Sequence, residues 1–194
     1  MQTLTVKDIY QQLPRLETTR LVLRKVTNGD IPDIFVYSSD SEVTRYLRWG
    51  PHQSLAETEN YIHGVLSEYH EGRDGPWGIE LKEKHAIIGQ IHLLEISLQH
   101  GKAQVGFVLA RDYWHKGIMA EALHTVLEHS FKEIGLNRIE GWCISANRAA
   151  EQVLKKAGMT REGELRDYLY QKGTFWNFSI YALLRKEFLR NALV

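Results

Sequence analysis

The segment richest in chemical possibilities runs from Val105 to Leu123, where an apolar strand passes through a short basic turn into an amphipathic helix. A helix start presents unpaired backbone N–H groups and the positive end of the helix dipole, so it attracts anions. Gly117 would allow a close approach to a pyrophosphate, and His115 or Lys116 would add positive charge. Neither the GxGxxG nor the GxxxxGK[ST] pattern is present, and an ordinary polar turn remains the alternative.

A second candidate for chemistry is His92. It lies in an apolar strand in which Ile91 and Leu93 point to the opposite face. An imidazole with an ordinary pKa of about 6.5 is suited to proton transfer near neutral pH. A histidine on a solvent-exposed strand face is the plainer interpretation, and the sequence leaves both open.

The single cysteine, Cys143, lies in the apolar run from Ile139 to Ile144. We interpret it as a small core residue rather than a nucleophile, because no activating base is evident beside it. One cysteine cannot form an internal disulfide, which indicates a reducing compartment. The N-terminal residues do not resemble a signal peptide, so we expect a cytoplasmic protein.

Composition narrows the class of protein further. The 194 residues, 43% of them hydrophobic, suit one domain over residues 1–194, with its core at about 16–187. The 24 basic and 24 acidic residues cancel, which disfavours nucleic acid and anionic lipid as partners. No apolar run approaches the length of about 18 residues that a membrane span needs. Whether the protein is a monomer or a homodimer stays open.

Hydrophobic spacing and turn signals predict an alternation of strands and helices that would position these residues. The expected order is strand, two helices, three strands, helix, strand, helix and two strands. We therefore expect an α+β fold with a mixed, mostly antiparallel central sheet flanked by helices. The predicted strands cover 20–26, 77–81, 86–96, 103–110 and 138–144 and both sides of Lys172-Gly173; the main helices cover about 54–71, 117–134 and 147–157.

Three segments carry a resemblance to a known family. The basic turn and its helix read YWHKGIMAEAL, the region near the start reads LETTRLVLR, and the C-terminal part reads ANRAAEQVLKKAGMTREGELRDYLYQKGTFWNFSIYAL. Together they resemble the GNAT (Gcn5-related N-acetyltransferase) superfamily, and specifically its RimJ/RimL-like branch. The resemblance covers roughly residues 16–184.

The resemblance implies an acetyl-CoA site. Backbone N–H groups of the turn and helix start would hold the CoA pyrophosphate, and the end of the preceding strand would bond to the pantetheine arm. The Phe107 N–H would face the acetyl carbonyl. Asn147 would meet pantetheine with its amide, although a helix N-cap is an equal alternative. The residues implied for the cofactor are Phe107, Val108, Leu109, His115, Lys116, Gly117, Ile118, Met119, Ala120 and Asn147.

The chain also departs from the family pattern. Trp114 and Met119 replace usual residues, but backbone groups do the binding there. Ala150 replaces a serine proposed to protonate the CoA thiolate, and Asn177 stands where an aspartate is common. The usual acid of the family is therefore missing, and a usual carboxylate is replaced by a neutral amide.

For catalysis we expect Phe107 as oxyanion donor, with His92 or a water chain as base. Tyr168 and Tyr170 are the candidate acids for protonating the thiolate, although tyrosines in paired strands usually serve to pack against neighbouring side chains. The resemblance implies acetyl-CoA as co-substrate and no metal.

The resemblance predicts an N-acetyltransferase acting on a primary amine, by direct transfer to a protein or peptide N-terminus of the ribosomal-protein type. A small-molecule amine such as an amino sugar, polyamine or antibiotic is one alternative. A non-catalytic acyl-CoA-binding module is the other. Residues 45–51 and the helix from Ser54 would shape the acceptor side, with Tyr46, Trp49 and Trp77 as possible walls.

Overall fold

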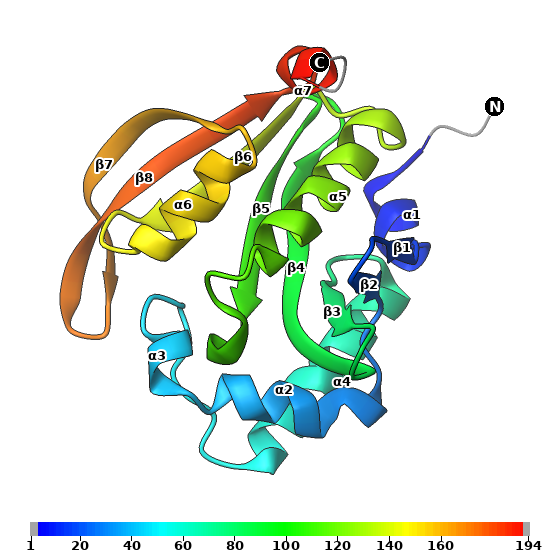
Figure 1. The fold of residues 1–194 in the computed structure, drawn as a ribbon, viewed down its shortest axis with the longest axis vertical. Coiled ribbons are helices and arrows are strands. Elements are labelled where there is room, and N and C mark those ends of the chain that lie inside the picture. Colours follow the sequence, from blue (N-terminus) through cyan, green and yellow to red (C-terminus); the bar gives the residue numbers. More distant parts are fainter. Residues whose placement is uncertain (1–3, 192–194) are drawn as a thin grey trace. The chain divides into compact units, whose positions relative to one another are not determined.

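The computed structural model describes residues 4–191. Its elements are labelled in Figure 1. The helices are α1 (Val6–Gln11), α2 (Ile31–Ser38), α3 (Ser41–Thr44), α4 (Leu55–Glu71), α5 (Ile118–Lys132), α6 (Arg148–Lys156) and α7 (Arg185–Asn191), with short 3-10 turns at Asn28–Asp30 and Arg111–Tyr113. The strands are β1 (Leu16–Glu17), β2 (Leu21–Arg24), β3 (Trp77–Leu81), β4 (Ala86–Ser97), β5 (Lys102–Leu109), β6 (Arg138–Ile144), β7 (Thr160–Gln171) and β8 (Thr174–Leu184).

The strands follow the order β1-β2-β3-β4-β5-β6-β8-β7. The pair β5–β6 is parallel, whereas β1–β2, β2–β3, β3–β4, β6–β8 and β7–β8 are antiparallel. The parallel pair requires a crossover, which α5 provides between the two strands. The expected α+β fold with a mixed, mostly antiparallel sheet is confirmed. Residues 4–191 contain no helix with both the length and the apolar character that crossing a bilayer requires.

The chain divides into two compact units, which are described separately. The first comprises Met1–Leu93 and Phe107–Thr125, and the second comprises Leu94–Gly106 and Val126–Val194. The division cuts through β4, β5 and α5. The prediction of one domain over residues 1–194 stays a prediction.

In the first unit, β1, β2, β3 and the start of β4 form an antiparallel ribbon. Leu23, Ile79 and Ile91 are fully buried on one face. The opposite face carries Gln90, whose amide oxygen accepts a hydrogen bond from Tyr61 of α4 at 2.8 Å. Side chains alternate between the two faces of a strand, so helix α4 covers the face of β4 opposite to the one that carries Ile91.

Local signals explain most element boundaries in this unit. As predicted, Ser54 caps the first turn of α4, and Gly72 ends the helix in a left-handed conformation. The predicted first strand was too long, because the N–H of Val26 donates to Tyr69 Oη at 3.2 Å instead of continuing a ladder. Helix α1 was not predicted, although Thr5 and Asp8 form a capping box there.

In the second unit, β6 pairs with β5 on one side and with β8 on the other. The β7–β8 hairpin turns at Lys172 and Gly173, both with positive φ, as the predicted flanking strands require. Helix α6 packs closely on β6, because a Cβ on Gly141 would overlap the Leu154 side chain. Cys143 is buried, as expected for a core residue.

A close approach of backbones in the first unit generates a prediction. A Cβ on Gly89 of β4 would overlap the carbonyl oxygen of Val108 and lie 3.1 Å from the Cα of Leu109. Backbone cannot move aside as a flexible side chain can, so we expect Gly89→Ala to lower the free energy of unfolding by about 1–3 kcal/mol. Gly64→Ala is the control, since Gly64 lies within α4 with no atom within 4 Å of an added Cβ. Urea denaturation that found the two variants equally stable would contradict the close approach.

Candidate active site

The turn between β5 and α5 has an unusual backbone. Both His115 and Gly117 adopt positive φ, at 60° and 75°. For a residue with a side chain this conformation costs roughly 1–2 kcal/mol, so His115 holds a strained position. Left-handed residues in a turn direct successive N–H groups into one concavity, which suits an oxygen-rich anion.

Helix α5 begins immediately after this turn. The N–H of Glu121 is bonded to the carbonyl of Gly117 at 3.0 Å, so the three preceding N–H groups lie ahead of the first helical bond. The side chains of Ile118 and Met119 are buried, which anchors the helix start while its backbone end stays available. His115 and Lys116 are exposed, and they add charge around the same end. The predicted pyrophosphate-binding group is thus brought together in one place.

A side-chain clamp holds the turn in position. Arg20, just before β2, forms an ion pair of 2.6 Å with Glu121 in the first turn of α5. The same guanidinium donates to the carbonyl oxygen of Lys116 at 3.0 Å. The Glu121 carboxylate also accepts hydrogen bonds from Thr18 Oγ1 at 2.5 Å and from the N–H of Arg20 at 3.1 Å. One carboxylate and its guanidinium partner therefore fix the segment before β2, the turn after β5 and the helix start relative to one another.

The charge of Glu121 is stabilised by this arrangement. Burial alone would raise the pKa of Glu121, but the hydrogen bonds from Thr18 and Arg20 outweigh it and hold the pKa below its ordinary value. Sequence reasoning missed the clamp, although both partners lie in segments quoted above for the family resemblance, LETTRLVLR and YWHKGIMAEAL. The signal available was a pair of opposite charges, and nothing in the spacing showed that they meet.

The C-terminal end of β5 leads into this turn. Phe107 and Val108 are half-buried and Leu109 is buried. The indole N–H of Trp114 donates to the carbonyl oxygen of Leu109 at 2.8 Å, so this departure from the family pattern has a structural function here. The strand end and the turn are thereby tied together.

His92 lies in the same compact unit. Its side chain is 31% exposed, and Nδ1 lies 3.9 Å from Asp74 Oδ1. Ile91 and Leu93 are buried on the opposite face, as their spacing predicted. The side chain is thus partly exposed, as a histidine on a strand face can be, while its Nδ1 is buried and has no hydrogen-bond partner within the described residues.

The second unit holds the other predicted residues. Asn147 Oδ1 accepts a hydrogen bond from the N–H of Ala150 at 3.1 Å, so Asn147 is an N-cap of α6. Tyr168 is 52% exposed and its ring packs edge-on against Trp142 and Phe178. The candidacies of Tyr168 as acid and of Asn147 for pantetheine stay predictions.

Two other residues singled out in the sequence have structural functions. Asn177 accepts from the N–H of Asp167 at 2.9 Å and donates to Glu164 at 2.8 Å, where the β7–β8 register shifts. Trp77 is fully buried and donates its indole N–H to the carbonyl oxygen of Pro14 at 2.8 Å, so it does not wall an acceptor pocket.

The Cys143 thiol is poorly suited to act as a nucleophile. Burial raises the pKa of the Cys143 thiol to about 12, and the nearby Glu151 carboxylate adds to this, so the thiol stays protonated. Within the described range no three His, Cys, Asp or Glu side chains are grouped to hold a metal ion.

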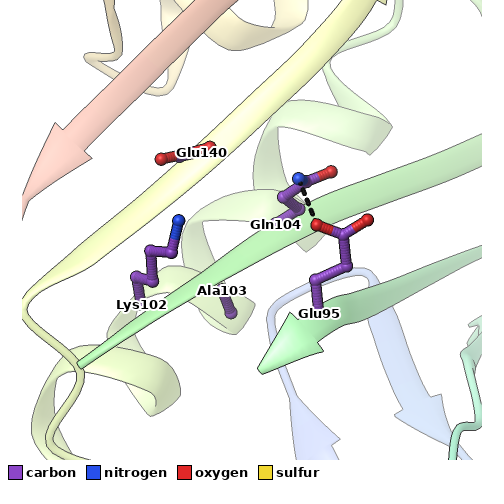
Figure 2. A pocket seen from close by; sticks show the side chains of 5 residues that line it. All are labelled: Glu95, Lys102, Ala103, Gln104 and Glu140. Atoms are coloured by element: carbon purple, nitrogen blue, oxygen red, sulfur yellow. Dashed lines mark hydrogen bonds between the residues drawn. The ribbon is translucent and has the colours of Figure 1, made fainter. Parts of the chain in front are cut away.

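Figure 2 shows a polar pocket in the second unit, lined by Glu95, Lys102, Ala103, Gln104 and Glu140. Gln104 donates to Glu95 at 2.7 Å, and Glu140 accepts from Arg138 and Trp142. The space holds about one water molecule. With its carboxylates already bonded and so little room, this pocket is unsuited to a CoA or an acceptor amine.

The mixed sheet, the crossover helix and the basic turn at the helix start are the features that the resemblance to acyltransferases implies. Residues 20–160 match the acetyltransferase (GNAT) domain family. The N-acetyltransferase YoaA of Bacillus subtilis is 33% identical over 172 residues, which cover 89% of this chain and 97% of that protein. The chain therefore belongs to the GNAT acetyltransferase family, whose acetyltransferases use acetyl-CoA.

Other similarities differ in the acceptor that they name. A spermidine N(1)-acetyltransferase of Vibrio cholerae is 22% identical over 174 residues, covering 90% of this chain and 98% of that protein. A GNAT-family acetyltransferase structure from Bacillus anthracis has a TM-score of 0.80 and 26% identity, covering 90% of this chain and all of that one. A structure of RimL, a ribosomal L7/L12 α-N-protein acetyltransferase with coenzyme A, has a TM-score of 0.78 and 21% identity, covering 88% and 98%. Similarity at this level establishes the fold and leaves the acceptor undetermined.

The left-handed turn predicts a specific sensitivity at Gly117. An added Cβ would have space, with its nearest neighbour an Arg20 nitrogen at 3.6 Å, but the positive φ would be strained. We expect Gly117→Ala to rotate the turn and weaken CoA binding about tenfold, since the strain of roughly 1–2 kcal/mol corresponds to that factor. Calorimetric titration with CoA measures it, with Gly64→Ala as control. An unchanged Kd would contradict the assignment of this turn to the pyrophosphate.

The clamp predicts a pH-dependent contribution to stability. Glu121→Gln removes a charge whose pKa is lowered in the folded state, so its contribution is complete above the unfolded pKa and is lost as pH falls through the folded one. Because Arg20 is half exposed, we expect a loss of about 1 kcal/mol at pH 7, or a fall in Tm of about 2–4 °C. The difference from the wild type should shrink below about pH 4.5.

Thermal denaturation between pH 3 and pH 7 measures this contribution. The exposed Glu133→Gln is the matched control for loss of a carboxylate charge. A difference between Glu121→Gln and the wild type that stays constant down to pH 3 would show that the carboxylate charge does not stabilise the turn.

Proposed function

We propose that this N-acetyltransferase uses acetyl-CoA to acetylate the α-amine of a protein or peptide N-terminus, of the ribosomal-protein type, by direct transfer. The observation that carries the donor side is the pair of left-handed residues, His115 and Gly117, clamped at the start of α5 by Arg20 and Glu121. This cradle fits a pyrophosphate, because Gly117 has no Cβ to fill the concavity and the surrounding side chains are basic.

The donor would be held mainly by backbone groups. N–H groups from His115 to Ala120 would bind the pyrophosphate, and the edge of β5 at Phe107–Leu109 would run beside the pantetheine arm. In Asn147 the cap uses Oδ1, so the Nδ2 group is the part that would meet pantetheine. Bound acetyl-CoA supplies an acetyl thioester for the amine to attack.

The chain must then provide three functions for the transfer. An amine attacks only as the free base, the carbonyl oxygen gains negative charge, and a thiolate departs. We assign the second function to the Phe107 N–H and the first to His92, whose Nδ1 is buried without a hydrogen-bond partner in the described residues. Tyr168 is assigned the third. A thiol is a fair leaving group near neutral pH, so a weak acid suffices even with Ala150 in place of serine.

A small-molecule amine is the second candidate acceptor, supported by the spermidine acetyltransferase relative. The two candidates differ in charge: a polyamine carries several ammonium groups, whereas a peptide N-terminus carries one beside a carbonyl. We also propose a cytoplasmic location, supported by the single buried cysteine. Monomer and homodimer both remain compatible with the proposal.

An amine panel tests the proposed function. The purified protein is incubated with acetyl-CoA and with spermidine, an amino sugar, an aminoglycoside, and peptides carrying ribosomal-protein N-termini. Mass spectrometry should find acetylation of a peptide α-amine, and none when that N-terminus is blocked. Faster acetylation of spermidine than of every peptide would contradict the proposed acceptor. Failure of CoA to bind at millimolar concentration would contradict the donor assignment.

A further inference from the structure

An unusual group of polar side chains occupies the face of β4 beneath α4. Gln90 and His92 are two residues apart, so their side chains share one face of the strand. Gln90 is only 5% exposed, yet its Nε2 has no hydrogen-bond partner within residues 4–191, and neither does His92 Nδ1. Leaving a buried polar group unpaired costs roughly 1–3 kcal/mol, so two of them on one face need an explanation.

The amide of Gln90 is oriented by its neighbour. Tyr61 Oη of α4 donates to Gln90 Oε1 at 2.8 Å. A hydroxyl can either donate or accept, so Tyr61 occupies one polar atom of the amide whichever way the amide is turned. The second polar atom, Nε2, is buried and has no hydrogen-bond partner in the described residues. It is a hydrogen-bonding group held ready, in a buried position, for a partner that the protein does not supply.

Asp74 adds a negative charge to this group. Its side chain is 44% exposed, and Oδ1 accepts a hydrogen bond from the N–H of Gly75 at 2.6 Å. In the described part of the chain, the only basic side chain within 4.0 Å of this carboxylate is His92, at 3.9 Å. That separation is too long for a hydrogen bond, but both atoms can contact a single ammonium nitrogen placed between them.

Two phenols, Tyr10 and Tyr61, lie close enough to Asp74 for its charge to act on them. Burial raises the pKa of Tyr61 to about 12, with a smaller contribution from Asp74. Burial likewise raises the pKa of Tyr10, whose hydroxyl donates to the carbonyl oxygen of Leu93 at 2.9 Å. Both phenols stay neutral, so Asp74 dominates the charge and attracts a cation.

We propose that Gln90, His92 and Asp74 form the acceptor-amine site of this enzyme, with Asp74 binding the ammonium, His92 taking its proton and Gln90 bonding to the first peptide group of the acceptor. This inference rests on the proposed function and deepens it, because it assigns the residues that recognise the acceptor.

The proposed amine site lies in the same compact unit as the residues proposed to bind acetyl-CoA. The N–H of Ala110 donates to the carbonyl oxygen of Ile88 at 2.8 Å, and Gly89 lies against Val108 and Leu109. Strands β4 and β5 run in opposite directions through a tight turn, so Gln90 lies beside the segment that begins at Phe107. The proposed amine site thus adjoins the strand end assigned to the acetyl group.

The surroundings favour a peptide over a polyamine. A row of aromatic rings leads outward from Gln90 through Tyr61, His52 and Trp49, with ring centroids 6.1 Å and 5.3 Å apart. Tyr61 and Trp49 are each more than one-third exposed, which gives an extended chain a surface to pack on. One carboxylate balances one ammonium, whereas a polyamine would leave its other charges unpaired.

These groups can carry out the proton transfers that accompany transfer of the acetyl group. His92 Nδ1 accepts a proton from the ammonium, and the freed amine nitrogen forms a bond to the thioester carbonyl carbon. The carbon–sulfur bond then breaks, and the thiolate sulfur takes a proton from water, or from Tyr168, which then regains a proton from solvent. The attacking nitrogen loses its second proton to solvent, and His92 returns its own there. Asp74 and Gln90 remain unchanged, so they act in binding, and His92 is the residue whose loss should affect the rate itself.

Three variants test the site against a control. Gln90→Leu should raise the KM for the peptide about tenfold, with the KM for acetyl-CoA unchanged. Asp74→Asn should raise the peptide KM at least tenfold. His92→Asn should lower kcat more than tenfold and alter the pH–rate profile. Glu59→Gln, which removes an exposed carboxylate on α4, should change none of these.

Thermal stability distinguishes this site from a structural cluster. Gln90→Leu removes the unpaired Nε2 but also removes the acceptor of the Tyr61 hydrogen bond, so the two effects offset and Tm should change by only a few degrees, even though peptide acetylation weakens. If Gln90→Leu instead lowers Tm sharply, or if the peptide KM stays normal in folded Gln90→Leu and Asp74→Asn proteins, the assignment is overturned. A wild-type protein that acetylates spermidine but no peptide would overturn the proposed acceptor and, with it, the role given to Gln90.

Discussion

The ion pair between Arg20 and Glu121 is the contact on which the proposed donor site depends, because it joins three segments that are far apart in the sequence. Arg20 precedes β2, Lys116 lies in the turn after β5, and Glu121 is in the first turn of α5. An anion-binding turn made of backbone N–H groups works only if its backbone is held still before the ligand arrives. The clamp provides that rigidity from side chains that need not touch the ligand. It also explains how His115 can be kept in a strained conformation.

Binding through backbone groups has a consequence for sequence variation. Met119 departs from the usual family residue, but its side chain is buried in the first unit while its N–H lies at the helix start. Trp114 also departs, and its indole instead fastens the turn to Leu109. Side chains in such a turn are free to serve the fold, since the ligand would be recognised by atoms that every residue carries. Substitution should be least tolerated at positions that need a particular backbone conformation, above all at Gly117.

Strand β4 serves two purposes because its side chains alternate. Ile91 and Leu93 fill the apolar core, whereas Gln90 and His92 point to the face beneath α4 and keep polar atoms unpaired. Stability alone would favour apolar residues or fully bonded polar ones on that face. We therefore base the proposed acceptor site on the unpaired buried groups and not on the aromatic residues singled out in the sequence. Trp77, for example, is a core residue bonded to Pro14.

Much of the fold followed from local patterns. The alternation of apolar residues predicted the strands, and their helical spacing predicted the main helices. Both succeed because the period of the apolar residues shows which face of an element is buried. Capping residues predicted the ends of α4, and the pair Lys172-Gly173 predicted the final hairpin, since turn chemistry is local as well. The short helix α1 escaped notice even though Thr5 and Asp8 signal its start.

The sequence by itself determined the α+β class and, through its motifs, the GNAT family, and it pointed to the turn at His115–Gly117 as the proposed pyrophosphate site. Only the tertiary structure decided that Arg20 meets Glu121 across 100 residues of sequence, and that Asp74 faces His92 from a loop. It also decided that Asn177 bonds to Asp167 and Glu164 at a register shift. Such contacts depend on how elements pack, and residue spacing within one element carries no information about a partner on another. Features that depend on neighbouring residues, such as turns and helix caps, could therefore be predicted from the sequence. The ion pairs and the unpaired buried polar groups could be identified only from the tertiary structure.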